Sequence, residues 1–563
     1  MTPHALPRRS AASLAIGALI VGGMLTVGTA TATKRKTCRP APKANCAGVN
    51  LAKRNLAGKN LAGINLKGAN LTGANLKGAK LTGATLTNAR LGRANLTNAV
   101  VTSARMGGAT VNGATVTGLV SGSVSGTPNS LPTSWQINSG YLMGPGANLT
   151  GANLIGQTLT AVDLTGATLT GALLTGATAY ASTFTNAAMG NANLAGATIT
   201  TSTLTGATLT GASLVGATFT SSGLVGADLT GATLTAATLS GTDLTGANLT
   251  RVSGRAATFS GAILKGANLT SAALGGNAQS SVALDGADLT GANLTSAVLA
   301  YASLSNANIA NAAISGTDLR NATYDGLRSG GLTGGTGARL PSGTWVVGGY
   351  FIGEQVDLSG ANLSNQVLTG LDFQGADLTR ANLSGARLLS ASLANATAVG
   401  ANFTGANLIL ATLGGADLRE SSVARATLTS ASFDGSLANA FYGAPPGPTV
   451  LTQNPPTVLT NMSGLDLSGV DLASTSKYWW QVNLSGANLA GTAFPNNGEF
   501  YYSVFARANL AGTDFRHTGG GEVKFRYANF TGATGVPAAI TGSPVWTDVV
   551  CPDGTLQNTA CTF

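Results

Sequence analysis

Large apolar residues recur at every fifth position over most of this chain. Three frames carry the pattern: residues 51–116 with 14 positions, 149–324 with 36 and 358–433 with 16. The only departures from a large apolar residue are Ala179, Gly254, Gln279 and Ala398. A period of five fits neither an α-helix of 3.6 residues per turn nor a plain alternating strand. The pattern therefore predicts short extended pieces joined by regular corners.

The positions around each apolar centre also repeat. The residue two before it is usually alanine, as at Ala69 and Ala74, the residue one before is often Asn, Asp or Thr, and glycine often closes the unit. In an extended piece, the centre and the residue two before it point to one side, and the flanking residues point to the other. Repeated corners would wind the chain into stacked coils with a buried ladder of centres. The alanines then fill a narrow interior where opposed walls meet.

Strings such as ANLTGANLKG, which begins at Ala69, state the rule A-(N/D)-L-x-x. This rule covers roughly three quarters of the chain and resembles the pentapeptide-repeat proteins. The resemblance implies an all-β fold, a right-handed quadrilateral β-helix with four repeats per coil. On that basis the three frames would build about 16 coils, a rod on the order of 80 Å long.

Breaks in the frame predict the domain organisation. The predicted segments are a signal peptide (1–32), a basic segment with a cysteine pair (33–48), repeat block 1 (49–118), an insertion (119–148), block 2 (149–326), a second insertion (327–357), block 3 (358–435), a proline-rich loop (436–463), irregular aromatic-rich repeats (464–532) and a C-terminal cap with a cysteine pair (533–563). Both insertions contain Leu-Pro, then Trp135 or Trp345, then Gly-Tyr at 140–141 or 349–350. We expect each to form a hairpin or loop whose tryptophan covers a coil edge rather than binding a ligand.

The N-terminus is typical of an exported protein. Arg8 and Arg9 precede an apolar run, and small residues up to Ala32 offer a cleavage site that would give a mature start near Thr33. A retained membrane anchor and twin-arginine export are the alternatives. We therefore expect a secreted or envelope-associated protein.

Four cysteines, an even number, favour disulfides in an exported chain. They are Cys38, Cys46, Cys551 and Cys561. A rod holds its two ends far apart, so we expect the local pairs Cys38–Cys46 and Cys551–Cys561. A zinc site is the alternative, disfavoured because His4 and His517 are the only histidines.

Composition and the distribution of charge favour some classes of function over others. Only 9% of the 563 residues are charged, and 78 are glycine. Residues 1–105 carry 16 of the 31 basic residues and no acidic one, whereas the rest carries 15 basic and 21 acidic residues. The basic residues fall on several faces, which suits adhesion to anionic polymers better than a groove for nucleic acid. Aspartates occupy the position that normally holds Asn, so no catalytic, cofactor or metal site is predicted.

Two surfaces are candidate binding sites. One is a ladder of hydroxyl groups that resembles the binding face of β-solenoid ice-binding proteins: Thr158, Thr160, Thr178, Thr198, Thr200, Thr218, Thr220, Thr238 and Thr258. The other is an aromatic platform for flat ligands, made of Trp479, Trp480, Tyr501 and Tyr502. A structural role is the competing interpretation of both.

The sequence thus favours a non-enzymatic structural or binding rod outside the cell. Envelope polymers, glycans or a protein are the candidate partners, and pairing of two rods stays open. The resemblance also suggests a DNA mimic like the family's topoisomerase-protecting members, but the leader and the positive charge disfavour it. An ice-binding or carbohydrate-binding solenoid is a further alternative, and a carbohydrate-active enzyme would need an acidic cleft that the sequence does not identify.

Overall fold

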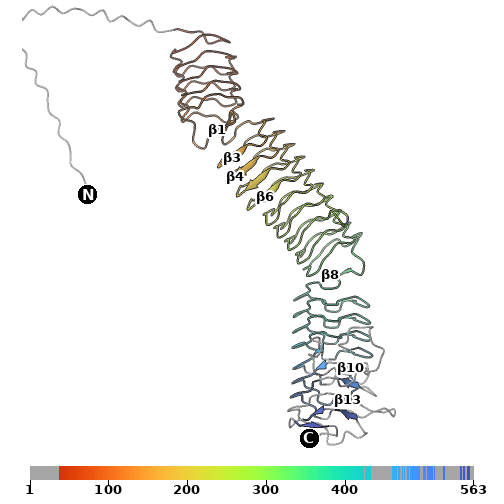
Figure 1. The fold of residues 1–563 in the computed structure, drawn as a ribbon. Coiled ribbons are helices and arrows are strands. Elements are labelled where there is room, and N and C mark those ends of the chain that lie inside the picture. The colour runs from red at the N-terminus through yellow and green to blue at the C-terminus, as the bar shows by residue number, and fades with distance from the viewer. Residues whose placement is uncertain are drawn as a thin grey trace, which may run out of the picture.

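The computed structural model describes residues 37–423, 425–432 and, in segments, 460–557. They form a long curved rod of stacked coils (Figure 1). The strands are Gln136–Asn138 (β1), Tyr141–Met143 (β2), Thr158–Thr160 (β3), Thr178–Tyr180 (β4), Thr198–Thr200 (β5), Thr218–Thr220 (β6), Trp345–Val347 (β7), Tyr350–Ile352 (β8), Thr460–Asn461 (β9), Tyr478–Trp480 (β10), Val482–Asn483 (β11), Glu499–Tyr501 (β12), Lys524–Arg526 (β13), Val545–Thr547 (β14), Val549–Val550 (β15) and Leu556–Gln557 (β16). Across these described segments, no helix has the length and apolarity to cross a membrane.

Most coils are held by single-residue parallel bridges that join residues 20 apart, such as Asn50 to Asn70 and Asn70 to Arg90. The centres and the alanines two before them are buried, as Leu71 and Ala69 show with no exposed surface. Four five-residue sides per coil therefore enclose one narrow core. The predicted four-sided β-helix is confirmed.

The residue before each centre shapes the corner that follows. Its side-chain oxygen accepts a hydrogen bond from the backbone N–H two residues on, at 3.1 Å for Asn70 with Thr72 and 3.0 Å for Asp228 with Thr230. Asn and Asp both supply this acceptor, since such local bonds mimic a backbone turn. The prediction that most aspartates belong to the repeat rather than to chemistry rests on this equivalence.

One side of block 2 is flatter than the rest. There β3, β4, β5 and β6 form a continuous parallel sheet in which Thr158, Thr178, Thr198 and Thr218 lie in register. Beneath it a ladder of buried serines replaces alanine. Ser182 Oγ donates to the carbonyl of Leu159 at 2.8 Å, and the Ser182 N–H donates to Ser202 Oγ at 3.0 Å. Ser202 N–H bonds Ser222 Oγ in the same way at 3.1 Å. These bonds supply hydrogen-bond partners for the buried serine hydroxyls and for backbone groups at the corner that follows the sheet.

Both insertions form antiparallel hairpins, β1–β2 and β7–β8, as expected. The hairpins are built alike: the hydroxyls of Tyr141 and Tyr350 each accept a 3.0 Å hydrogen bond from the backbone N–H twelve residues later. The chain leaves the regular coil late in each predicted insertion, since bridges still join Ser130 to Thr110 and Arg339 to Asp318.

The expected equivalence of the two tryptophans is wrong by one residue. With the tyrosines matched, Trp135 corresponds to Thr344, and Trp345 corresponds to Gln136, which pairs with Met143 as Trp345 pairs with Ile352. A shift of one residue turns a side chain to the opposite face of a strand. Trp135 accordingly packs against the core and covers a coil edge, whereas Trp345 is 41% exposed.

The rod changes direction near each hairpin (Figure 1). At the first, the core itself divides: Leu142 belongs to the N-terminal hydrophobic cluster and Met143 to the C-terminal one. Trp135 contacts both clusters, and with Leu131 and Pro132 it closes the inner space of block 1. The hairpins are thus the joints between straight stretches of coil.

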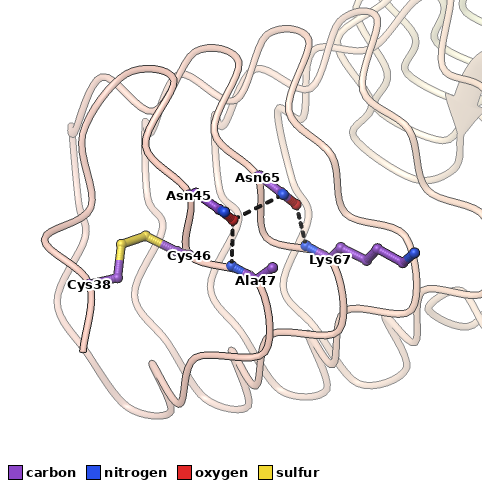
Figure 2. Close-up of a disulfide and its surroundings, with 6 residues drawn as sticks. All are labelled: Cys38, Asn45, Cys46, Ala47, Asn65 and Lys67. Carbon is purple, nitrogen blue, oxygen red and sulfur yellow. Dashed lines mark hydrogen bonds between the residues drawn. A yellow bond between two sulfur atoms is a disulfide. The ribbon is translucent and has the colours of Figure 1, made fainter. Parts of the chain in front are cut away.

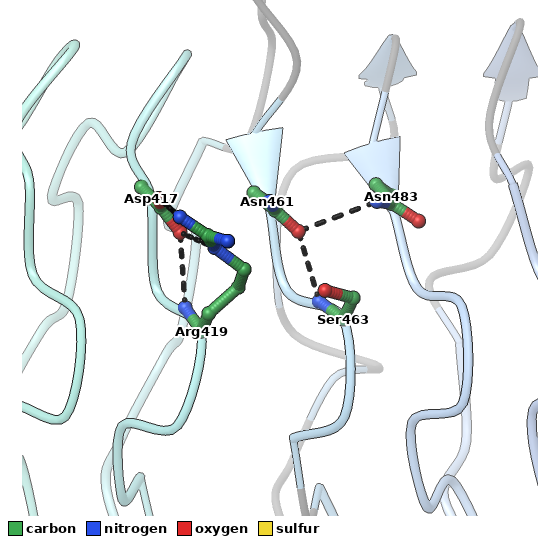
Figure 3. A network of polar contacts seen from close by, with 5 residues as sticks. All are labelled: Asp417, Arg419, Asn461, Ser463 and Asn483. Atoms are coloured by element: carbon green, nitrogen blue, oxygen red, sulfur yellow. Dashed lines mark hydrogen bonds and ion pairs between the residues drawn. The ribbon is translucent and has the colours of Figure 1, made fainter.

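Two other breaks leave the stack continuous. Thr258 bridges Ala283 rather than a residue 20 later, so five extra residues loop out around the exposed Gln279. Further on, Asn461 bridges both Asp417 and Asn483, and Figure 3 shows the three side chains in one column. The prolines of the predicted loop lie outside the described residues, and β9 already belongs to the rod.

Candidate functional site

The first repeat block and the short segment before it carry only basic residues among their charged side chains. Among residues 37–118, all eleven basic side chains are exposed: Arg39, Lys43, Lys53, Arg54, Lys59, Lys67, Lys77, Lys80, Arg90, Arg93 and Arg105. No acidic residue lies in this stretch, and the four ion pairs within the described residues all lie between 265 and 419. The cations point from corners and sides alike. The block therefore projects positive potential in all directions, with no neighbouring carboxylate to cancel it.

Two of these cations lie in the first coils, at the N-terminal end of the stack. Arg54 and Lys59 stand two residues before Leu56 and Leu61, the position that alanine fills elsewhere, and both are exposed. Charged side chains at such a position discourage other strands from adding to an open edge. This end is also crosslinked by the predicted disulfide Cys38–Cys46, whose Cα atoms are 5.4 Å apart (Figure 2).

Beside the disulfide the side-chain amides of two neighbouring coils are hydrogen-bonded. Asn45 Oδ1 accepts hydrogen bonds from Asn65 Nδ2 at 3.0 Å and from the backbone N–H of Ala47 at 3.3 Å (Figure 2). At the other end of the rod, Cys551 is disulfide-bonded too, and Cys561, its predicted partner, lies outside the described residues.

The predicted threonine ladder is a real geometric feature. In the first column Thr158, Thr178 and Thr198 are exposed and in register. In the second column Thr160, Tyr180 and Thr220 are exposed and Thr200 is half-buried, and all four are in register. Tyr180, 53% exposed, interrupts the second column. The array also stops short of its predicted end, because Thr258 Oγ1 is buried and without a partner in the described part of the chain.

The predicted aromatic platform is wrong in one member. Trp479 is fully buried, and its ring centroid lies 5.5 Å from that of Phe494 in an edge-to-face contact. It packs inside the coil and offers no surface to a ligand. Trp480 and Tyr501 pair in β10 and β12, and Tyr502 lies outside the described residues.

The described carboxylates are mostly held by their own repeat. Asp318 accepts two hydrogen bonds from the Arg320 guanidinium, at 2.9 and 2.7 Å, and this contact holds the pKa of Asp318 below its usual value. The Arg419 guanidinium donates hydrogen bonds to both carboxylate oxygens of Asp417 in the same way (Figure 3). In these pairs the carboxylate is engaged by the arginine of its own corner.

Family membership follows from the repeats. A family model described as pentapeptide repeats (8 copies) matches about half of the chain, at residues 44–83, 79–118, 146–176, 202–235, 212–251, 232–270, 285–323, 354–385 and 386–422. The chain belongs to the pentapeptide-repeat family.

Solved structures of other pentapeptide-repeat proteins are similar at low identity. QnrB1, a plasmid-mediated fluoroquinolone resistance protein, is 19% identical over 32% of this chain and 89% of its own, with a TM-score of 0.22. HetL, involved in heterocyst differentiation regulation in Nostoc sp. strain PCC 7120, is 25% identical over 51% and 92%, with a TM-score of 0.12. A thylakoid lumen protein of Arabidopsis thaliana is 26% identical over 28% and 68%, with a TM-score of 0.09. No curated protein matches the chain.

One group of side chains in this pentapeptide-repeat protein escaped sequence reasoning. Glu354 lies beside Asp372 and Asp325, and burial together with these two carboxylates raises the pKa of Glu354. The three residues come from different coils that the second hairpin brings together. Alignment of the two hairpin segments residue by residue, rather than by their tryptophans, is the signal that could have found them.

Proposed function

We propose that this protein is an exported, non-enzymatic rod whose basic N-terminal block adheres to anionic polymers of the cell envelope. The observation that supports this best is the set of eleven exposed, unpaired cations of residues 37–118, nine of them in block 1, on every side of one stack. A polymer chain can reach such a surface from any direction, and its affinity comes from many weak contacts. The rest of the rod then projects away as a spacer.

Export is supported by the leader-like sequence before Thr33 and by the disulfides, which persist in oxidising compartments. Expression in the native host should place the protein in the secreted or envelope fraction. N-terminal sequencing of that product should begin near Thr33. An uncleaved chain confined to the cytosol would overturn this part of the proposal.

Polymer adhesion is tested with polyphosphate as the probe. Replacing Lys53, Lys67, Lys77 and Arg93 with Gln should weaken binding in sedimentation or biolayer assays and flatten its dependence on salt, because fewer counterions are released. The matched control replaces Arg251, Arg255, Arg380 and Arg387, four cations of the body, and should bind as the wild type does. Equal loss in both variants, or binding unaffected by salt, would count against a specific basic block.

The flat sheet favours a second candidate, binding to the ordered water of an ice surface. Hydroxyl and methyl groups repeat there at the inter-strand spacing of about 4.8 Å on a backbone held by the serine ladder. In an ice-shaping assay, Thr160→Tyr with Thr200→Tyr should abolish activity. Thr150→Tyr with Thr170→Tyr, on another side of the rod, should leave it unchanged. Wild-type protein that leaves ice crystals unshaped would dispose of this candidate.

A further inference from the structure

The two hairpins share one backbone arrangement but carry different side chains. In both, the N–H of Gly118 or Gly326 donates to the residue that re-enters the coil, Gly146 at 2.7 Å or Gln355 at 2.7 Å. The next coil follows with the same bonds, from Gly146 to Thr165 and from Gln355 to Gln374, at 2.8 Å each. The fold is therefore indifferent to which residues stand at these places.

The differences gather at one corner of the second hairpin. Position by position, Val116, Thr117, Pro145, Gly146, Thr165 and Gln136 of the first give way to Tyr324, Asp325, Glu354, Gln355, Gln374 and Trp345. Small or apolar groups are thus replaced by a phenol, two carboxylates and two amides, and the amide of Gln136 is replaced by an indole. Since the first hairpin folds without them, the scaffold does not require these groups.

Three of these groups, the side chains of Asp325, Gln355 and Gln374, border an open cavity of about 450 Å³. The cavity is lined by the amide residues Asn306, Gln355, Gln374 and Asn395, by Asp325 and by two glycines. None of the four amides has a hydrogen-bond partner in the described part of the chain, unlike the bonded amides of Asn45 and Asn65. The volume lies in the range of small-ligand sites. The polar side chains around it suit a ligand that is bound by hydrogen bonds rather than by apolar contact.

One aromatic side chain lies at this corner, and a second is exposed on the hairpin that leads to it. Tyr324 is half-buried against Phe351, with ring centroids 5.2 Å apart, and burial and the neighbouring Glu354 raise the pKa of its hydroxyl. Trp345 is exposed opposite Ile352, and β8 leads from there to Gln355 three residues later. An exposed indole presents an apolar face on which a sugar ring can stack.

From this geometry we infer that the corner of the second hairpin binds a carbohydrate segment through its hydroxyl groups. Amides both donate and accept hydrogen bonds, and carboxylates accept two each, which matches adjacent hydroxyls that do both. Four amides and one carboxylate line the cavity. Because amides donate as well as accept hydrogen bonds, a sugar fits better than a cation, which needs acceptors only. A basic peptide is the competing ligand and serves as an outcome of the test. This site is independent of the adhesive block.

The first hairpin supplies substitutions that the scaffold already accommodates. Trp345→Gln, and separately Gln355→Gly with Gln374→Thr, install the residues of the first hairpin in the second. Calorimetric titration of the full chain with chitohexaose, cellohexaose and maltohexaose should give binding of at least one by the wild type. Each variant should bind it about tenfold more weakly, as expected for the loss of one or two good contacts.

The matched control is Thr165→Gln in the first hairpin, which should bind as the wild type does. Circular dichroism of all variants should be unchanged. The inference fails if the wild type binds none of the three sugars, if both hairpin variants keep full affinity, or if hexalysine is the only ligand that binds.

Discussion

Replacing Leu229 with Asp is expected to unfold the middle of the rod while both flanks stay folded. Leu229 has no exposed surface and stacks between the centres of the coils before and after it. The change removes a buried side chain and places an unpaired carboxylate in the core, a loss on the order of 5 kcal/mol. Because each coil of a solenoid contacts only its neighbours, the damage stays local. Limited proteolysis should cut near residue 229, and urea unfolding should become multiphasic.

The control for this variant is Ser213→Asp. Ser213 is the residue before a centre, where twelve aspartates already occur in the repeats, and its neighbours in the column are Asn193 and Thr233. A carboxylate there reaches solvent and can accept the corner hydrogen bond, so stability should hardly change. Equal protease sensitivity of the two variants would contradict the inward and outward assignment of the repeat.

Trp135→Ala is expected to uncouple the first block from the rest of the rod. Trp135 is the partly buried side chain that packs on both hydrophobic clusters at the first joint. Truncating a tryptophan there should cost about 2 kcal/mol, less than for a fully buried ring. Since the two cores meet at this side chain, calorimetry should show the first block melting in a separate, earlier transition.

Trp345→Ala tests whether that effect belongs to the joint. Its side chain is 41% exposed on an equivalent hairpin, so thermal unfolding should shift little. A single transition in the Trp135 variant, or an equal shift in both, would show that Trp135 does not couple the two cores.

The sequence predicted the coils because their rule is local. A centre such as Leu71, its inward partner Ala69 and the corner acceptor Asn70 sit within three residues, so period and polarity identify all three. The cysteine pairing was open to prediction for the same reason, since Cys38 and Cys46 close one small loop at the first coil.

What escaped prediction depends on contacts between coils. Trp479 sits in a run of aromatics that resembles a platform, yet as the middle residue of β10 it points inward onto Phe494. The tryptophans of the insertions match in type but not in position, because Trp135 lies six residues before Tyr141 and Trp345 five residues before Tyr350. Strand pairing shows that this offset places the two side chains on opposite faces. The cavity wall joins Asn306, Gln355 and Asn395 across a hairpin, a relation that spacing in the chain does not express.

The five-residue loop around Gln279 has a consequence for the whole C-terminal half. Five residues make one side of a coil, so had they entered the stack, every later residue would have moved by a quarter turn about the rod axis. Because these five residues leave the stack, the sides of the coils before and after the loop stay aligned, and Ala283 lies beside Thr258. Insertions in multiples of five are invisible in the repeat frame. Whether each one loops out or is wound in therefore decides which surfaces of the rod face the same way.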